Sequence, residues 1–515
     1  MLQKICCFLM VACWGLHLSA QPNNLLPNIV NIQPGTSLPG IVRQAANVTP
    51  SSRQLRWQEL ELTAFFHFGV NTFTDREWGE GTEKEQIFNP TQLDAGQWVV
   101  ACKAAGIKQV ILTAKHHDGF CLWPSALTEH SVKNSPWKGG KGDVVREVSD
   151  ACHQQHIGFG VYLSPWDRNS KLYGTDAYND YFVGQLTELL SNYGRIDEVW
   201  FDGACGEGPN GKKQVYDFER WYGVIRKLQP TATIAISGPD VRWVGTESGY
   251  GRETEWSVIP VGKKLLNDVA DGSQKDVNFP PVGDLTKSDL GSREALASAQ
   301  TLVWYPAETD VSIRPGWFFH DKDNARVKSG EKLMDIYFHS VGRNGVLLLN
   351  IPPDRRGLLN ENDVKALADW KNIRDNLFKV NLAKGAKVTC PNGEGMRRML
   401  DGNSSTHFTT TGNDTTTMII FNLKGKQTFD VLLLQENIRI GQRIEQFRLE
   451  VLKDGKWLTA TEGTTVGYKR LVQFAPVTTD RVRLSILSSR LNPTIAEFGL
   501  YKMKLNPSSD SGTEA

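Results

Sequence analysis

The 515-residue sequence predicts an α/β fold, a (β/α)8-like barrel, followed by an all-β sandwich domain. Between about residues 55 and 380, short apolar runs alternate with helical patterns of a dozen or so residues, which indicates βαβ units and a parallel sheet. The alternation continues over roughly 300 residues, which favours a barrel. After about residue 382 only short β-type runs follow, as is typical of a sandwich.

Composition narrows the classes of function. Hydrophobic residues make up 40% of the chain and charged residues 22%, as in folded globular proteins. The formal net charge is +1, so we expect neither nucleic acid nor an anionic membrane as a partner. Three of the eight cysteines lie in the first 20 residues, and the others are widely spaced. That spacing fits neither a disulfide framework nor a zinc site.

Residues 1–20 are predicted to be a secretory signal peptide. An apolar run from Ile5 to Leu16 follows a positive start and precedes small residues. The run is too short for a permanent membrane span, so we expect a secreted protein, periplasmic or extracellular. A lipoprotein signal ending at Cys13 is less favoured because it would leave a very short leader. Residues 21–54 are predicted to be an N-terminal arm that is either wrapped or loose.

The barrel domain is expected to cover residues 55–382. Glycines at 106 and 194 are placed to end helices, and Asp143 is placed as an N-cap. Between residues 256 and 330 the pattern is too weak to assign elements. The expected strands are 64–70, 109–114, 159–164, 199–202, 233–237 and 345–352, and the expected helices are 93–105, 143–156, 177–193, 215–228 and 362–378.

The sandwich domain is expected to cover residues 383–505. Several short β-type runs lie there, and Asp454-Gly455 is predicted to be the turn of a hairpin between two of them. Residues 506–515 are polar and are predicted to be a loose tail.

Polar side chains lie at the ends of the first four predicted strands. His67 lies in the first strand, His116 and His117 follow the second, and Trp166-Asp167 follow the third. Asp202 follows the fourth, at the start of a glycine-rich loop. Because the functional face of a barrel lies at the carboxyl ends of its strands, we expect a polar pocket with aromatic walls. Neutral His and Trp around a carboxylate suit a neutral, hydroxyl-rich ligand.

Each residue taken alone has another interpretation. His67 could be a core histidine. His116 and His117 could bind a metal, but adjacent residues in an extended segment point to opposite sides, so no metal is predicted. Glu77 and Trp78 could be a surface pair. No phosphate-binding glycine loop and no nucleophile elbow of the G-x-S-x-G type is present.

Five segments of the barrel domain together resemble glycoside hydrolase family 29, the retaining α-L-fucosidases. They are HFGVNTF at 67–73, KHHDGF at 115–120, YLSPWD at 162–167, VWFDGA at 199–204 and SVGRNGVLLLNIPPDRRG at 340–357. YLSPWDRN and TESGYGRETEW resemble the subfamily that acts on α-1,3/1,4-linked fucose. In the sandwich domain, LDGNSSTHFTT at 400–410 resembles a discoidin-type domain, similar to the C domains of coagulation factors 5 and 8.

The resemblance implies a role for each matching residue. Asp202 is the implied nucleophile and Glu247 the implied acid/base, with Glu253 and Glu255 as rivals. The implied substrate is a fucosylated oligosaccharide or glycoconjugate. No cofactor is implied for catalysis, and a structural calcium ion in the sandwich domain stays open. The implied sugar-binding residues are His67, Glu77, Trp78, His116, His117, Trp166, Asp167, Arg252 and Trp317.

Other functions remain open at this point. A fucosidase of broad specificity would also act on α-1,2 or α-1,6 links or on aryl fucosides. The same scaffold could take another sugar, or act as an inactive, fucose-binding lectin. The sandwich domain could bind a glycan or only brace the barrel.

Overall fold

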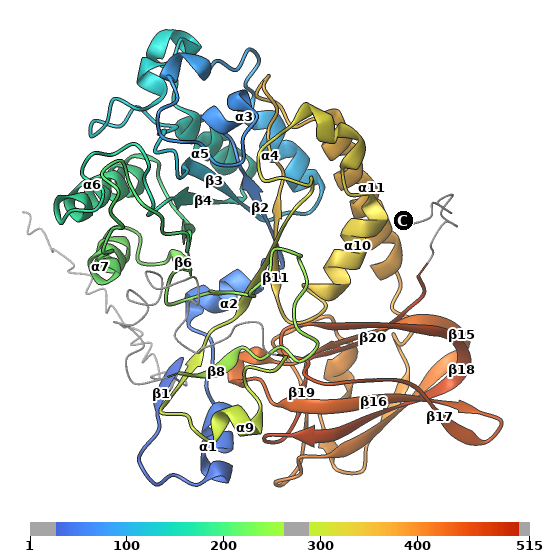
Figure 1. Cartoon of the computed structure of the whole chain (residues 1–515). Helices are drawn as coiled ribbons and strands as arrows, with labels where there is room; N and C mark the ends of the chain where they lie inside the picture. The colour runs from blue at the N-terminus through green and yellow to red at the C-terminus, as the bar shows by residue number, and fades with distance from the viewer. Residues whose placement is uncertain (1–26, 262–287, 504–515) are drawn as a thin grey trace, which may run out of the picture.

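The computed structural model describes residues 27–261 and 288–503. The predicted signal peptide and the predicted tail lie outside the described residues. The predicted fold class is confirmed, because a ring of parallel strands is followed by an antiparallel sandwich (Figure 1). In the described part of the chain, no helix combines the length and the apolar character needed to cross a membrane.

Eight parallel strands form the barrel, in the order β6, β5, β4, β3, β2, β11, β10, β7. The hydrogen-bonded order begins at β6 and ends at β7, so the seam of the barrel lies between these two strands. The strands are β2 Leu62–Phe66, β3 Gln109–Lys115, β4 Gly158–Leu163, β5 Glu198–Phe201, β6 Thr233–Ile236, β7 Arg242–Trp243, β10 Ala307–Ser312 and β11 Val346–Asn350.

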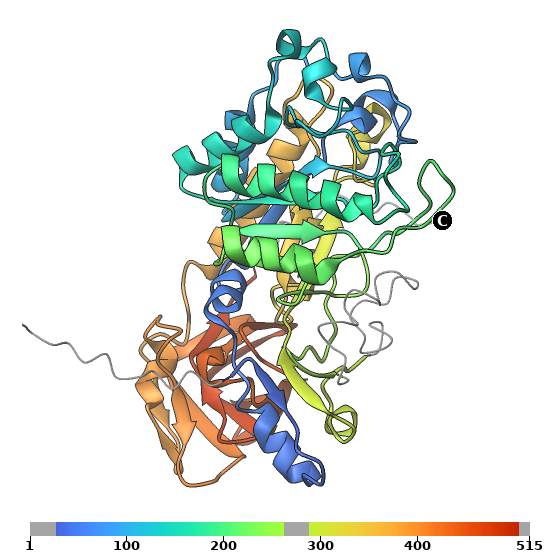
Figure 2. The ribbon, with the colours of Figure 1, turned by 90° about the vertical axis from the view of Figure 1, so that its left-hand side faces the viewer.

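Helices surround the strands on the outside (Figures 1 and 2). The predicted N-cap of α5 is confirmed, because the Asp143 carboxylate accepts a hydrogen bond from the backbone N–H of Arg146 at 2.8 Å. The outer helices are α4 Ala95–Ala104, α5 Val144–Gln155, α6 Ala177–Asn192, α7 Phe218–Leu228, α10 Gly330–His339 and α11 Glu361–Phe378, and shorter helices are α2 Ser52–Gln58 and α3 Val70–Thr74.

The structure differs from the sequence expectations at three places. The first strand ends at Phe66, and the last residue expected in it, Val70, begins α3. Helix α7 begins at Phe218, because Asp217 caps it by accepting from the N–H of Arg220. The segment without assigned elements, residues 256–330, contains β10, and α10 begins at its last residue. Strand β10 reads AETDVS, and its alternating polar residues hide the apolar run that the sequence search required.

The N-terminal arm is wrapped. Strand β1, Ile29–Asn31, pairs with β9, Thr301–Trp304, which pairs with β8, Val258–Val261. Helix α1, Leu38–Ala45, packs beside the short helix α9, Arg293–Leu296. These elements lie alongside the sandwich domain (Figure 2) and share a small apolar core with its Ile438.

The sandwich domain begins at β12, after α11 ends at Phe378. The predicted hairpin turn is confirmed, because Asp454 and Gly455 have φ of 50° and 75° and connect β16 to β17. One sheet contains β12 Lys387–Thr389, β15 Thr417–Gln435, β16 Ile444–Lys453, β17 Lys456–Gly463, β18 Arg470–Ser489 and β20 Glu497–Tyr501, and the other contains β13 Gly393–Glu394, β14 Phe408–Thr410 and β19 Thr494–Ile495.

Candidate active site

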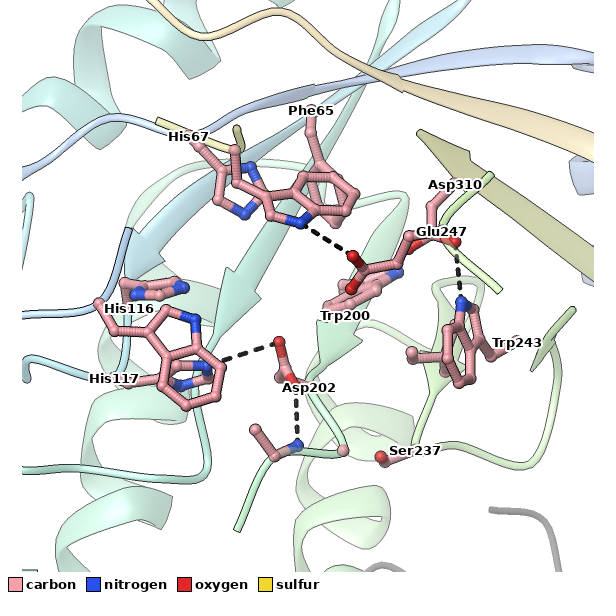
Figure 3. Close-up of a pocket in the computed structure, with 15 residues that line it drawn as sticks. Phe65, His67, His116, His117, Trp200, Asp202, Ser237, Trp243, Glu247 and Asp310 are labelled. Carbon is pink, nitrogen blue, oxygen red and sulfur yellow. Dashed lines mark hydrogen bonds and ion pairs between the residues drawn. The ribbon is translucent and has the colours of Figure 1, made fainter. Parts of the chain in front are cut away.

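A cavity of about 270 Å³ lies at the carboxyl ends of the barrel strands. It contains three carboxylates and three histidines among aromatic side chains (Figure 3). Seven of the eleven residues predicted from the sequence line it. The lining residues are Phe65, His67, Trp78, His116, His117, Trp200, Asp202, Gly203, Ala204, Ile236, Ser237, Trp243, Glu247, Asp310 and Trp317.

Asp202 is held rigidly at the end of β5. Its Oδ1 accepts a hydrogen bond from the backbone N–H of Ala204 at 2.7 Å, and its Oδ2 accepts from the Tyr162 hydroxyl at 3.1 Å. His117 Nε2 lies 3.8 Å from the same Oδ2. The side chain of Asp202 is still 27% exposed, so this oriented carboxylate can be reached from the cavity. A fixed carboxylate of this kind can act as a nucleophile.

Glu247 faces the cavity from the loop that follows β7. Its Oε2 accepts a hydrogen bond from the indole N–H of Trp317 at 3.3 Å (Figure 3). Partial burial is the largest cause of a raised pKa at Glu247, and the negative charge of Asp202 adds to it. A carboxyl group with a raised pKa keeps its proton to higher pH, as a general acid requires.

The hydrogen bonds of His117 define its tautomer. The Ser164 hydroxyl gives its proton to the backbone carbonyl of Trp166 at 2.7 Å, so it accepts from His117 Nδ1, also at 2.7 Å. Burial lowers the pKa of His117, which makes the neutral ring the dominant form. Its Nε2 therefore presents a lone pair towards the cavity and Asp202, where it can accept a hydrogen bond from a hydroxyl group.

His67 has the same tautomer for a similar reason. The amide nitrogen of Asn350 donates to Ser312 Oγ at 2.9 Å and to the Trp317 carbonyl at 2.7 Å, which leaves its oxygen facing His67 Nδ1 at 2.9 Å. Burial lowers the pKa of His67 to about 3, so the ring is neutral and its Nε2 is an acceptor.

His116 has the opposite tautomer. Its Nδ1 lies 3.4 Å from the side-chain nitrogen of Asn71, a donor, so the ring proton belongs on Nε2. Burial lowers the pKa of His116 well below its ordinary value, which keeps the ring neutral. The three rings together present two acceptors and one donor, a set that suits the hydroxyl groups of a neutral sugar.

The expectation that His116 and His117 point to opposite sides was wrong. Their ring centroids lie 4.1 Å apart, and both rings line the cavity. Residues 116–119 form a turn rather than an extended strand, which removes the alternation on which the expectation depended. Among the described residues, no group of three or more His, Cys, Asp or Glu side chains is arranged to hold a metal ion.

Four predicted sugar-binding residues lie outside the lining of the cavity. The Glu77 carboxylate accepts from the backbone N–H of Trp317 at 2.7 Å, and so holds that indole in place. Trp166 packs against Trp78 and His117. Asp167 forms a buried ion pair with Lys115 at 3.0 Å, and Arg252 forms one with Glu255 at 3.0 Å.

The two rivals of Glu247 also lie outside the lining. Glu253 is paired with Arg343 and Arg470, and Glu255 is paired with Arg242 and Arg252. Each carboxylate is thus engaged in ion pairs with two guanidinium groups and is directed away from the cavity lining. Of the three carboxyl groups considered for the acid role, Glu247 alone lines the cavity.

Sequence reasoning missed Trp200 and Asp310 as site residues, and it placed Trp243 only as a residue flanking the loop of Glu247. Trp200 lies two residues before Asp202 on β5, so the two-residue period of the strand could have placed both in the barrel interior. Trp243 and Asp310 lie on β7 and β10, which carry too weak a strand pattern to be found. The indole N–H of Trp243 donates to Asp310 Oδ1 at 2.8 Å, and burial raises the pKa of Asp310 to about 7.

Comparisons with known proteins agree with these features. The profile of the alpha-L-fucosidase family matches residues 45–373, and that of the F5/8 type C domain matches residues 385–498. Alpha-L-fucosidase 1 of Arabidopsis thaliana is 42% identical over 477 residues, which are 90% of this chain and 90% of that protein.

Solved structures give the same result. A Bacteroides ovatus protein is 46% identical with a TM-score of 0.84, over 96% of this chain and 80% of the other. A GH29 fucosidase of Ruminococcus gnavus, solved in complex with fucose, is 34% identical with a TM-score of 0.79, over 89% of this chain and 95% of the other.

The titration of Asp310 makes the free energy of unfolding depend on pH. Between about pH 4 and 7 the folded protein holds a proton that the unfolded chain has released, so stability falls as the pH rises through this window, by about 1.4 kcal/mol for each unit. Asp310→Asn cannot titrate and keeps an acceptor for Trp243. We expect its stability advantage over the unsubstituted protein to grow from pH 4 to 7 and then to level off, measured by urea denaturation.

The same substitution at Asp150, whose side chain is 53% exposed, is the matched control and should show no such trend. A stability difference for Asp310→Asn that is constant from pH 4 to 8 would contradict the assigned titration.

Proposed function

This chain belongs to the alpha-L-fucosidase family of glycoside hydrolases, family 29, and we propose that it releases terminal α-1,3/1,4-linked L-fucose from branched glycans by a retaining double displacement. The observation that carries the proposal is the pairing in one cavity of Asp202, a rigidly held carboxylate, with Glu247, a carboxyl group of raised pKa. The fucose bound by the related R. gnavus enzyme supports fucose as the sugar.

The proposed first step forms a bond between Asp202 and the anomeric carbon of fucose. The bond from that carbon to the leaving oxygen breaks, and the proton of Glu247 passes to the leaving oxygen. In the second step the Glu247 carboxylate takes a proton from water, and the water oxygen displaces Asp202 to release fucose. The mechanism requires the two carboxyl groups to stand about 5–5.5 Å apart.

The neutral histidines would hold the sugar without adding charge to the site. His67 and His117 can each accept a hydrogen bond from a sugar hydroxyl group, and His116 can donate a hydrogen bond to a third oxygen. The side chain of Trp78 lines the cavity and is 54% exposed, so it offers a stacking surface at the rim for a second sugar ring. Such a surface supports a branched substrate.

We also propose that the enzyme is exported across a membrane. The support for export is the signal-like segment 1–20 of the sequence, which lies outside the described residues. Export would bring the enzyme to the periplasm or the cell exterior, where it would meet glycans.

The linkage preference can be measured with two substrates. We expect the enzyme to release L-fucose from a Lewis-type branched trisaccharide with a kcat/KM at least about a hundredfold higher than from a nitrophenyl α-L-fucoside, because the branch would use contacts beyond the fucose pocket. Comparable release from both would discard the linkage proposal and keep the fucosidase. Release from neither would overturn both.

Replacement of Asp202 tests the nucleophile. We expect Asp202→Asn to lower kcat at least about a thousandfold, because the amide cannot form the glycosyl-enzyme. The amide oxygen can still accept from the N–H of Ala204, so the loop and fucose binding should persist, as measured by calorimetry.

Asp167→Asn, in the buried pair with Lys115, is a control for the loss of a nearby carboxylate that does not line the cavity. Substantial turnover by Asp202→Asn, or an equal loss of turnover in both variants, would remove Asp202 from the role.

We also propose a structural calcium ion in the sandwich domain. Among the described residues, Oε1 of Glu497 is buried without a hydrogen-bond partner, and burial and the charge of Asp401 raise the pKa of Glu497 to about 7. A cation would relieve both penalties, since Ca²⁺ prefers oxygen ligands. Asp401 and Glu497 would supply carboxylate oxygens to the ion, which would join the segment around Asp401 to β20.

Chelation tests the calcium proposal. We expect EDTA to lower the Tm of the protein by several degrees, and added Ca²⁺ but not Mg²⁺ to restore it, because a ligand of the folded state stabilises that state. Glu497→Gln should melt at the same temperature with and without EDTA. A Tm of the unsubstituted protein that does not respond to EDTA would refute the proposal.

A further inference from the structure

The loop that carries Glu247 leaves the barrel at its weakest point. Strand β7, which precedes the loop, contains two residues, and within residues 27–261 and 288–503 it pairs with β10 alone. It also stands at the seam. Three residues separate the end of β7 from Glu247, and such a short strand gives the loop little support on that side.

The far end of the loop is bound by the sandwich domain. The Thr465 hydroxyl accepts from the backbone N–H of Glu255 at 2.9 Å. Gln442 donates to the backbone carbonyl of Glu255 at 3.0 Å and accepts from the N–H of Ser257 at 2.7 Å. Thr465, Gln442 and Glu255 are each at most 1% exposed, so water does not compete for these bonds.

A second set of bonds holds the residues nearer to Glu247. The Thr464 hydroxyl donates to the carbonyl of Glu253 at 2.9 Å, and the guanidinium of Arg470 donates to the same carbonyl at 2.7 Å. Arg470 also forms an ion pair with the carboxylate of Glu253. The sandwich domain thus forms hydrogen bonds with the main chain of the loop at Glu253, six residues after Glu247.

Glu255 connects these contacts with the sandwich domain to the barrel. Its carboxylate pairs with Arg242, the first residue of β7, and with Arg252. Arg242 is fully buried and donates to the backbone carbonyls of Tyr305 and Trp256 at 2.9 and 3.0 Å. The side chain of Glu255 therefore links the strand before Glu247 to the segment after it. The main chain of Glu255 is hydrogen-bonded to the sandwich domain.

We propose that the sandwich domain positions the acid/base of the enzyme, with Glu255, Thr464 and Thr465 as positioning residues for Glu247. The inference rests on the proposed role of Glu247. A general acid must lie within hydrogen-bond reach of the leaving oxygen, and a displacement of about 1 Å can lower a rate about a hundredfold. The domain then contributes to the chemical step while remaining outside the cavity.

The test uses the double variant Thr464→Val/Thr465→Val, which keeps side-chain volume and removes both hydroxyl groups. The first substrate is a fucosylated oligosaccharide, whose leaving group needs a proton. The second is α-L-fucosyl fluoride with azide present, a combination that needs neither a general acid nor a general base. We expect kcat to fall at least about tenfold on the oligosaccharide and to stay within about twofold on the fluoride.

The controls separate positioning from stability. Thr464→Ser/Thr465→Ser keeps the hydroxyl groups and should restore turnover of the oligosaccharide. Arg439→Gln breaks the ion pair with Glu59, another contact between the two domains that does not involve the loop, and should leave the ratio of the two rates unchanged. If the double variant does not fold, Thr464→Val alone, at a half-buried position, is measured in the same way.

A parallel loss on both substrates, or no loss on either, would overturn the inference. Glu247→Gln, measured beside the others, keeps the proposed function separate: it should lose the oligosaccharide rate and keep the fluoride rate. If Glu247→Gln retains the oligosaccharide rate, the role of Glu247 fails, whatever the threonine variants do.

Discussion

The site depends on polar side chains that are buried inside a barrel whose interior is filled by side chains. Glu198 and Trp200 project inward from β5, and Asp202 does so directly after its end. Glu308, Asp310 and Ser312 project inward from β10. Each buried carboxylate must find a donor or keep its proton. Indole groups serve as donors: Trp57 binds Glu198 at 3.1 Å, Trp200 binds Glu308 at 2.7 Å, and Trp243 binds Asp310. These bonds orient two of the rings that wall the cavity.

The same burial explains the charges in the site. It lowers the pKa of each of the three histidines and raises the pKa of Glu247 and of Asp310. The Asp202 carboxylate accepts hydrogen bonds from a backbone N–H and a tyrosine hydroxyl, and its side chain is partly exposed to the cavity. Two carboxyl groups thus acquire different environments within one pocket, a division that acid/base glycoside chemistry requires.

The sequence was sufficient wherever one local rule decided the structure. The N-cap at Asp143, the turn at Asp454-Gly455 and the delivery of Asp202 by a buried strand each follow from a few neighbouring residues. Strands β7 and β10 could not be found, since their inward positions are occupied by Trp243, Glu308 and Asp310 rather than by aliphatic residues. Partners that face these positions come from distant parts of the chain, so no local pattern reveals that a polar strand is a core strand.

The acid/base loop also shows that the local sequence does not decide which residue is functional. Within TESGYGRETEW the sequence offers three glutamates at 247, 253 and 255, and nothing local separates them. The separation comes from arginines far away in the sequence: Arg470 of the sandwich pairs with Glu253, and Arg242 of the barrel pairs with Glu255. Both of these carboxylates are occupied by guanidinium groups, while the Glu247 carboxyl accepts from an indole N–H and has a pKa raised by partial burial. Tertiary packing thus leaves one carboxyl group suited to carry a proton, and the packing that does so includes the second domain.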